Sequence, residues 1–171
     1  LDIKKEKAQI RSNIGVITHE LLLYSELTAY QNLLFYGKLF GLSDIEQRIH
    51  WVTNITGTQT YLGKQIKHMS HGMQKRVSIA RAILHDPAIL FLDEPETGLD
   101  QEAVDGLHEM IGLGLKGRRT ILMTTHSLDT GFSMADTITV LSGGKISYNK
   151  KKIDIDRNVF EKEYANLRHN K

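Results

Sequence analysis

Three segments of the chain are almost entirely apolar, and each is followed by polar residues. They run from Ile14 to Thr18, from Ala88 to Leu92 and from Thr120 to Thr125. Apolar runs of this length, without alternation, are typical of parallel strands covered by helices on both faces. Two further short strands are expected at about 137–141 and 145–148. They flank Gly143 and Gly144, a pair that predicts a tight hairpin.

The stretch between the first two strands has helical spacing and almost no strand signal. Thr28 to Gln31 and Ser43 to Glu46 both fit the capping-box pattern of a helix start. Ser70 is a candidate cap for a third helix, and Pro87 separates that helix from the next strand. The segment is therefore predicted to be a helical insertion.

Helices at about 101–115 and 128–135 are expected to alternate with the later strands. The pattern predicts an α/β fold with a mostly parallel sheet and an inserted helical subdomain. The expected parts are an α/β core at 1–18 and 86–149, a helical subdomain at 19–85, and a peripheral tail at 150–171.

Composition narrows the class of protein. The 171 residues are 40% hydrophobic and 25% charged, as in globular domains. The net charge of +2 gives no strong attraction to nucleic acid, and the absence of cysteine excludes disulfides and cysteine–zinc sites. Apolar runs are about five residues long, whereas a membrane helix needs roughly 20. Any link to a membrane is therefore expected to run through a partner.

The acidic pair Asp93-Glu94 follows the second apolar run directly. Ligands of open parallel sheets bind at the carboxyl ends of strands. Asp93 is therefore a candidate ligand of Mg²⁺, and Glu94 a candidate base for the water that attacks a γ-phosphate. Pro95 is expected to hold Glu94 in extended backbone. The alternative is a pair of exposed acids that cap the next turn.

Three other sites carry candidate chemistry. Ser70 and Gly72 lie where a helix begins, a place that offers free N–H groups to an anion. Asp100 is a candidate cap of the following helix, and His126 follows the third apolar run, where an imidazole can reach a γ-phosphate. Taken singly, Ser70 and His126 are more readily explained by ordinary structural roles, but the acid pair at the same edge of the sheet favours a functional role for His126.

In this order and spacing, the segments resemble the nucleotide-binding domain of ABC ATPases over about residues 12–148. The signature motif of the family is matched by Met69-Ser70-His71-Gly72-Met73, and Walker B by the strand ending in Asp93-Glu94. Gly98-Leu99-Asp100 is similar to the D-loop, and Thr124-Thr125-His126-Ser127 to the H-loop. The resemblance implies a P-loop NTPase that binds and hydrolyses ATP with Mg²⁺.

Three departures from the family pattern stand out. The Walker A loop and the β-subdomain are expected before Ile14, and no such loop is found in this sequence. His19 stands where the family's Q-loop has Gln, and it remains a candidate for the nucleotide and for a metal-bound water. His71 replaces the first signature glycine, and Met73 replaces the signature glutamine. A side chain at His71 can crowd the γ-phosphate or donate to it.

The resemblance also implies partners. Two such domains dimerise head to tail around ATP, as homodimer or heterodimer, and drive an integral membrane permease from the inner face of the cell membrane. Ser70, His71 and Gly72 are then expected to contact the partner's nucleotide, while Asp93, Glu94 and His126 act on their own. The alternatives are a soluble ABC-type ATPase of DNA repair or translation, and an inactive truncated chain. A finer similarity, to haem-exporter ATPases, rests on residues 18–20, 23–28, 31–33 and 35–37.

Overall fold

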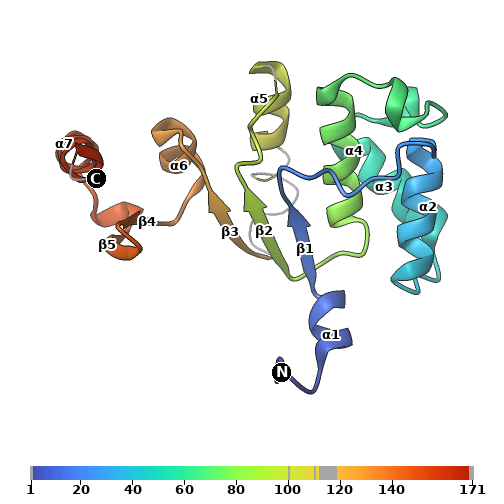
Figure 1. Ribbon diagram of the computed structural model, residues 1–171, viewed down its shortest axis with the longest axis horizontal. Coiled ribbons are helices and arrows are strands. Elements are labelled where there is room, and N and C mark those ends of the chain that lie inside the picture. The colour runs from blue at the N-terminus through green and yellow to red at the C-terminus, as the bar shows by residue number, and fades with distance from the viewer. Residues whose placement is uncertain (1, 100, 110, 112–118, 170–171) are drawn as a thin grey trace. The chain divides into compact units, whose positions relative to one another are not determined.

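A computed structural model describes residues 2–99, 101–109, 111 and 119–169 (Figure 1). The chain divides into two compact units, Leu1–Thr125 and His126–Lys171. The first unit contains helices α1 (Lys7–Ser12), α2 (Ala29–Leu39), α3 (Ile45–Thr56), α4 (His71–Ile83) and α5 (Gln101–Glu109), and strands β1 (Ile14–Ile17), β2 (Ile89–Asp93) and β3 (Thr120–Thr124). The second contains α6 (Leu128–Met134), β4 (Thr137–Ser142), β5 (Lys145–Lys151) and α7 (Arg157–His169). Short 3-10 helices lie at Gln59–Tyr61, Ile66–His68 and Lys152–Asp154.

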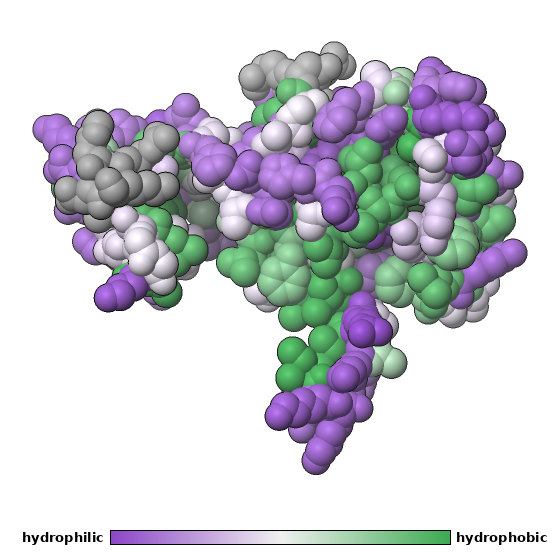
Figure 2. All heavy atoms as spheres, viewed as in Figure 1, coloured by the Kyte–Doolittle hydropathy of each residue, from purple (hydrophilic) through white to green (hydrophobic). Residues whose placement is uncertain are grey.

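The three apolar runs form the predicted parallel sheet, and its strand order is β1-β2-β3. Alternate side chains of β2 face opposite sides, so Leu90 and Leu92 are buried while Ile89 and Phe91 are exposed. Leu122 of β3 pairs with Phe91 and is also exposed. Figure 2 shows apolar atoms gathered over the strands of this unit. Coverage on both faces was expected, but within the described residues one face keeps these large apolar side chains exposed.

Helix α4 lies close against β1. A Cβ atom at Gly15 would come within 2.4 Å of the carbonyl oxygen of Ala82, so only glycine permits this approach. Asn13 O accepts a hydrogen bond from Ile89 N, which turns the carbonyls of residues 14, 16 and 18 toward the other edge of β1. Side chains of α4 and the turn after it reach all three: His85 Nε2 to Ile14 O at 3.0 Å, Arg81 Nη2 to Val16 O at 2.7 Å, and Lys75 Nζ to Thr18 O at 3.2 Å.

Helices α2, α3 and α4 lie together on the β1 side of the sheet (Figure 1). Thr28 and Gln31 form the predicted capping box at the start of α2. The second predicted capping box is wrong, because α3 begins after Asp44, whose side chain makes no capping bond. A small core of Ala29, Ile66, Met69 and Val77 joins this helical segment to α4.

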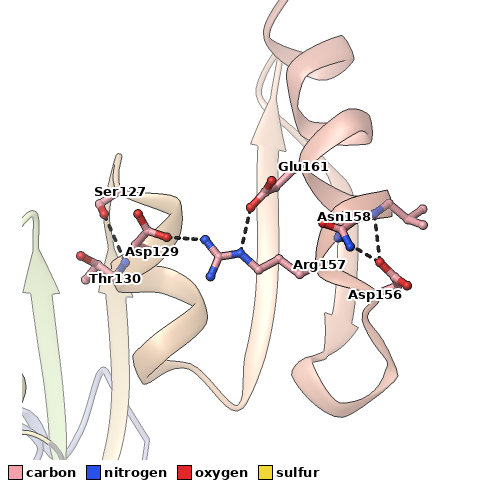
Figure 3. A network of polar contacts seen from close by, with 8 residues as sticks. Ser127, Asp129, Thr130, Asp156, Arg157, Asn158 and Glu161 are labelled. Carbon is pink, nitrogen blue, oxygen red and sulfur yellow. Dashed lines mark hydrogen bonds and ion pairs between the residues drawn. The ribbon is translucent and has the colours of Figure 1, made fainter.

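The second unit has its own core, built from Phe132, Val140 and Phe160. Strands β4 and β5 form the predicted antiparallel hairpin, and both turn glycines have positive φ, as its tight turn requires. Arg157, at the start of α7, bonds Asp129 of α6 and Glu161 one turn further along α7 (Figure 3). The predicted peripheral tail is thus a helix that packs on the hairpin.

Candidate functional site

The acidic pair after β2 is fixed by a threonine of the neighbouring strand. Thr124 Oγ1, at the end of β3, donates to Asp93 Oδ1 at 2.6 Å. The same oxygen accepts from the backbone N–H of Glu94 at 3.2 Å, and that N–H also lies 3.1 Å from Thr124 O. One hydroxyl therefore bridges the two acidic residues and holds both at the carboxyl edge of the sheet.

The carboxylate of Glu94 faces the segment that leaves β1. Its Oε2 lies 3.6 Å from His19 Nε2 and accepts from Thr97 Oγ1 at 3.3 Å. The Glu94 side chain is 20% exposed and that of His19 is 57% exposed. The pair is therefore open to solvent on the His19 side, as a base that activates a water molecule must be.

The backbone of Glu94 corrects one prediction. Pro95 was expected to hold this residue extended, yet Glu94 has φ of 45°, in the left-handed region that non-glycine residues rarely adopt. The chain turns sharply at Glu94, directly after β2, and the two hydrogen bonds that the Glu94 N–H donates to Thr124 fix that turn. Such a strained backbone is common where a side chain must point in one direction.

A buried amine lies under the acidic segment. Lys75 of α4 is 1% exposed, and burial lowers its pKa, while the nearby carboxylates of Glu96 and Asp93 act in the opposite direction. Glu96 is held by Thr125 Oγ1 through one oxygen. Its other oxygen is buried and, among the described residues, has no hydrogen-bond partner. The positive charge of Lys75 is therefore favoured by a Glu96 carboxylate that water does not fully solvate.

The start of α4 contains the residues of the predicted anion site, which stays a prediction. Ser70 caps the helix, with its Oγ accepting from Met73 N at 3.3 Å. Gly72 lies in the first turn, and an added Cβ there would meet nothing within 4 Å. His71 Nδ1 lies 3.3 Å from Gly98 O, so this helix start touches the turn that follows Glu94.

The donor set suits a hard cation held with few protein ligands. Among the residues that the structure describes, no group of three or more His, Asp or Glu side chains could hold a metal ion. Asp93 is exposed and offers one carboxylate at a strand end. Mg²⁺ is commonly held by one or two carboxylates together with water and phosphate oxygens, so Asp93 fits that cation when a nucleotide supplies the other ligands.

Comparison with protein families gives the decisive match. The family model described as "ABC transporter" matches residues 1–97, which is more than half of the chain. The chain belongs to the ABC transporter family. A solved structure described as "Structure of ATP binding subunit of ABC transporter" superposes with a TM-score of 0.85 at 26% identity, over 98% of this chain and 73% of that chain. The predicted α/β fold of ABC ATPases is thereby confirmed.

Curated relatives in the ABC transporter family are about a third identical to this chain over the aligned residues. The ABC transporter ATP-binding protein NatA of Bacillus subtilis is 33% identical over 150 residues, which are 86% of this chain and 61% of NatA. The Nod factor export ATP-binding protein I of Neorhizobium galegae is 36% identical over 138 residues, 80% of this chain and 40% of the relative. The linearmycin resistance ATP-binding protein LnrL of Bacillus subtilis is 30% identical over 155 residues, 90% of this chain and 50% of LnrL. The chain thus spans between two fifths and three fifths of these relatives.

The structure brings some of the residues predicted from the ABC pattern together. Asp93, Glu94 and His19 share one site, and His71 joins the signature segment to the turn after that site. Asp100 lies outside the described residues. His126 is the first residue of the second unit, and its predicted role at the γ-phosphate stays a prediction. No helix in the described parts of the chain is long and apolar enough to cross a membrane.

Sequence reasoning missed three members of the site. Thr124 was noted only as part of a motif, although its hydroxyl bridges Asp93 and Glu94. Lys75 and Glu96 were passed over, because a lysine on a polar helix start and an acid in a turn are usually solvated. The burial of Lys75 and of one Glu96 oxygen arises only in the folded chain, and no local sequence signal marks it.

Proposed function

We propose that this chain belongs to the ATP-hydrolysing subunit of an ABC transporter, with Glu94 as the general base. The observation that carries this proposal is the arrangement of Asp93 and Glu94 at the carboxyl end of β2, joined by the Thr124 hydroxyl. Adjacent acids in this place can divide the work, one toward a cation and one toward water. When bound, Mg²⁺ neutralises charge on the phosphates, and Asp93 is the residue that holds it.

His19 is proposed to contact the water that Glu94 activates. Its ring is largely exposed and lies 3.6 Å from the Glu94 carboxylate, so both side chains border the same open space. Glu94 Oε2 also accepts from Thr97, which limits its rotation. A base held in this way meets water in one orientation, and orientation is a large part of its contribution to rate.

The start of α4 is proposed to contact the nucleotide of a second ATP-binding domain. Ser70, His71 and Gly72 open a helix of 13 residues, whose free N–H groups favour an anion. The open space around the Gly72 Cβ position leaves room for a phosphate. This arrangement supports a head-to-tail dimer, homodimeric or heterodimeric, with ATP between the two copies.

An aromatic surface on the helical segment is proposed to dock on the membrane permease. Tyr24, Phe35 and Tyr36 form edge contacts at 5.0 and 5.3 Å, and Tyr24 and Phe35 are 50% and 39% exposed. The Tyr36 hydroxyl donates to Leu22 O, and Leu22 is itself exposed. Exposed rings of this kind are enriched at protein interfaces. Binding there would place the subunit on the inner face of the membrane.

Two finer assignments remain as proposals. The similarity of residues 18–37 to haem-exporter ATPases suggests a haem-related substrate, but the relatives described above carry other names and give this no specific support. A soluble, non-transport ABC ATPase is the second candidate, and the exposed Tyr24–Phe35 surface argues for the transporter. Purifying the full-length protein from membranes and testing whether a permease copurifies with it distinguishes the transporter subunit from the soluble ATPase.

The test is Glu94→Gln in the full-length protein, because amide replaces carboxylate at nearly constant shape. We expect ATP hydrolysis to fall by about 100- to 10,000-fold while ATP binding is kept. The matched control is Glu20→Gln, an exposed acid on the same segment as His19, which should leave turnover unchanged. Hydrolysis by Glu94→Gln at the wild-type rate would show that Glu94 is not the base.

A further inference from the structure

Lys75 is an unusual residue for its position. It lies on the second turn of α4, five residues after the cap Ser70, and is 1% exposed. Lysine is almost never buried to this degree without a partner, because its ammonium group loses its hydration. The contacts of its amine therefore indicate what the residue is for.

The amine holds the point at which the chain leaves β1. Lys75 Nζ donates to Thr18 O at 3.2 Å, and Thr18 immediately precedes His19. Ser78, on the same side of α4, donates to Leu21 O at 2.7 Å. The short segment that contains His19 is therefore bonded to α4 on both sides of the histidine.

The charge of the Lys75 amine is favoured by carboxylates of the acidic segment. The carboxylates of Glu96 and Asp93 act on the amine, and one oxygen of Glu96 is buried with no hydrogen-bond partner among the described residues. A neutral side chain at this position would remove the positive charge that these carboxylates favour. The amine thus donates to the segment after β1 and is attracted by the charges of the acidic segment after β2.

We propose that Lys75 is a positioning residue that fixes His19 against the Glu94 carboxylate. The path runs from Lys75 Nζ to Thr18 O at 3.2 Å, along the backbone to His19, and from His19 Nε2 to Glu94 Oε2 at 3.6 Å. It connects α4, which carries Ser70, to the proposed base within one chain. The importance of this path for hydrolysis rests on the proposed function of Glu94.

The direct test observes His19 in this chain without nucleotide. The ring Cε1–H signal of His19 and the Thr18 carbonyl ¹³C signal are recorded by NMR at one fixed pH. Lys75→Met, which keeps length but removes the charge and the donor, should move both signals. Lys75→Arg should return the His19 signal to near its wild-type position, and Lys67→Met, an exposed lysine paired with Glu26, should move neither. A His19 signal unchanged in Lys75→Met overturns the proposal.

The second arm measures ATP hydrolysis by the full-length protein. Lys75→Met should lower kcat about 10- to 100-fold, the scale expected for a misplaced catalytic group. KM for ATP should stay within about twofold, because no substrate contact is removed. Lys75→Arg should recover most of the rate, and a loss that Lys75→Arg does not recover overturns the proposal.

Two further points keep the arms separate. If Lys75→Met loses its dispersed spectrum, Lys75→Leu, which also removes the donor and the charge but carries a smaller apolar side chain, is measured with the same expectation for His19. If the wild-type protein hydrolyses no ATP, the proposed function fails, and the NMR arm alone then decides whether Lys75 positions His19.

Discussion

Some side chains of the site make more than one hydrogen bond, so a substitution there breaks several contacts at once. Thr124 shows this most clearly, since one hydroxyl donates to Asp93 and accepts from the Glu94 N–H. Serine could make both bonds, whereas valine, of the same shape, could make neither. Glu94 keeps its left-handed backbone because these bonds over-determine the turn.

His71 and Gly98 form a pair in which each residue limits the other. Gly98 has φ of 80°, and an added Cβ would come within 2.6 Å of the His71 ring. Gly98→Ala should therefore lower the free energy of unfolding by about 1–3 kcal/mol, from backbone strain and the clash. In the background of His71→Ala the same change should cost less, because only the strain remains.

Chemical denaturation of the four proteins in this cycle measures the coupling. If Gly98→Ala costs less free energy in the His71→Ala background than in the wild type, the His71 ring lies over Gly98 in solution. Strict additivity of the two changes would mean that the ring lies elsewhere.

At the scale of elements, α4 is fixed along β1 by polar contacts as well as by packing. Side chains on one face of the helix and in the turn after it bond the free carbonyls of β1, which would otherwise lack partners. An exposed strand edge is thereby covered by a helix. Because the contacts recur along the whole strand, α4 cannot slide without breaking several of them.

His85 makes this arrangement sensitive to pH. Its ring stacks on Phe40 with a centroid distance of 3.8 Å. Burial lowers the pKa of His85 below 6.5, and the charges of Arg81, Arg119 and Arg48 lower it further, whereas the hydrogen bond to Ile14 acts in the opposite direction. The unfolded chain then binds a proton more readily than the folded one. The contribution of neutral His85 to stability is therefore complete above the pKa that His85 has in the unfolded chain, and it is lost as the pH falls below that pKa.

His85→Gln should make the free energy of unfolding depend less steeply on pH between about 5.5 and 7.5. Denaturation curves collected across this range give the slope. His68→Gln, a change at an exposed histidine, should keep the wild-type slope. A wild-type slope in His85→Gln would mean that His85 is not the buried group that titrates.

At the scale of the whole molecule, two units carry separate cores. The core of the second unit centres on Phe160, whose ring lies 5.2 Å from Phe132 and 4.8 Å from Tyr148. The first unit holds the sheet, the helical segment and the acidic pair. Trp51, the one tryptophan in the sequence, lies on α3 of the first unit, so its fluorescence reports on that unit.

Phe160→Ala should destabilise the second unit by about 3–5 kcal/mol, because Phe160 is 2% exposed and its removal leaves a cavity in that core. Thermal unfolding followed by NMR should show signals of the second unit lost first. Trp51 fluorescence should change at a higher temperature. Val159→Ala, at the exposed neighbouring position, should unfold like the wild type. Coincident loss of both sets of signals in Phe160→Ala would mean that the chain unfolds as one unit.

Much of the fold could be predicted because its signals are local. The apolar runs of β1, β2 and β3, the capping box at Thr28 and the glycine pair of the hairpin each depend on neighbouring residues only. The second capping box failed because Asp44 took the cap position next to Ser43, which illustrates that competing caps one residue apart cannot be ranked locally.

The candidate site was predicted in part for the same reason. Asp93 and Glu94 directly follow a strand, and ligands of parallel sheets bind at the carboxyl ends of strands, so their location could be inferred. The conformation of Glu94 could not, because its φ is set by Thr124, 30 residues away in sequence.

The sequence by itself determined the strands, most helix starts and the acidic pair, since periodicity and capping act over a few residues. Only the tertiary structure decided which polar groups share a site. It buried Lys75, turned its amine to Thr18, and brought His19 to Glu94. Those contacts join segments separated by 57 and 75 positions in the chain, and they form only when α4 packs against β1 and β1 pairs with β2. Distances of this kind follow from packing, which no local pattern specifies.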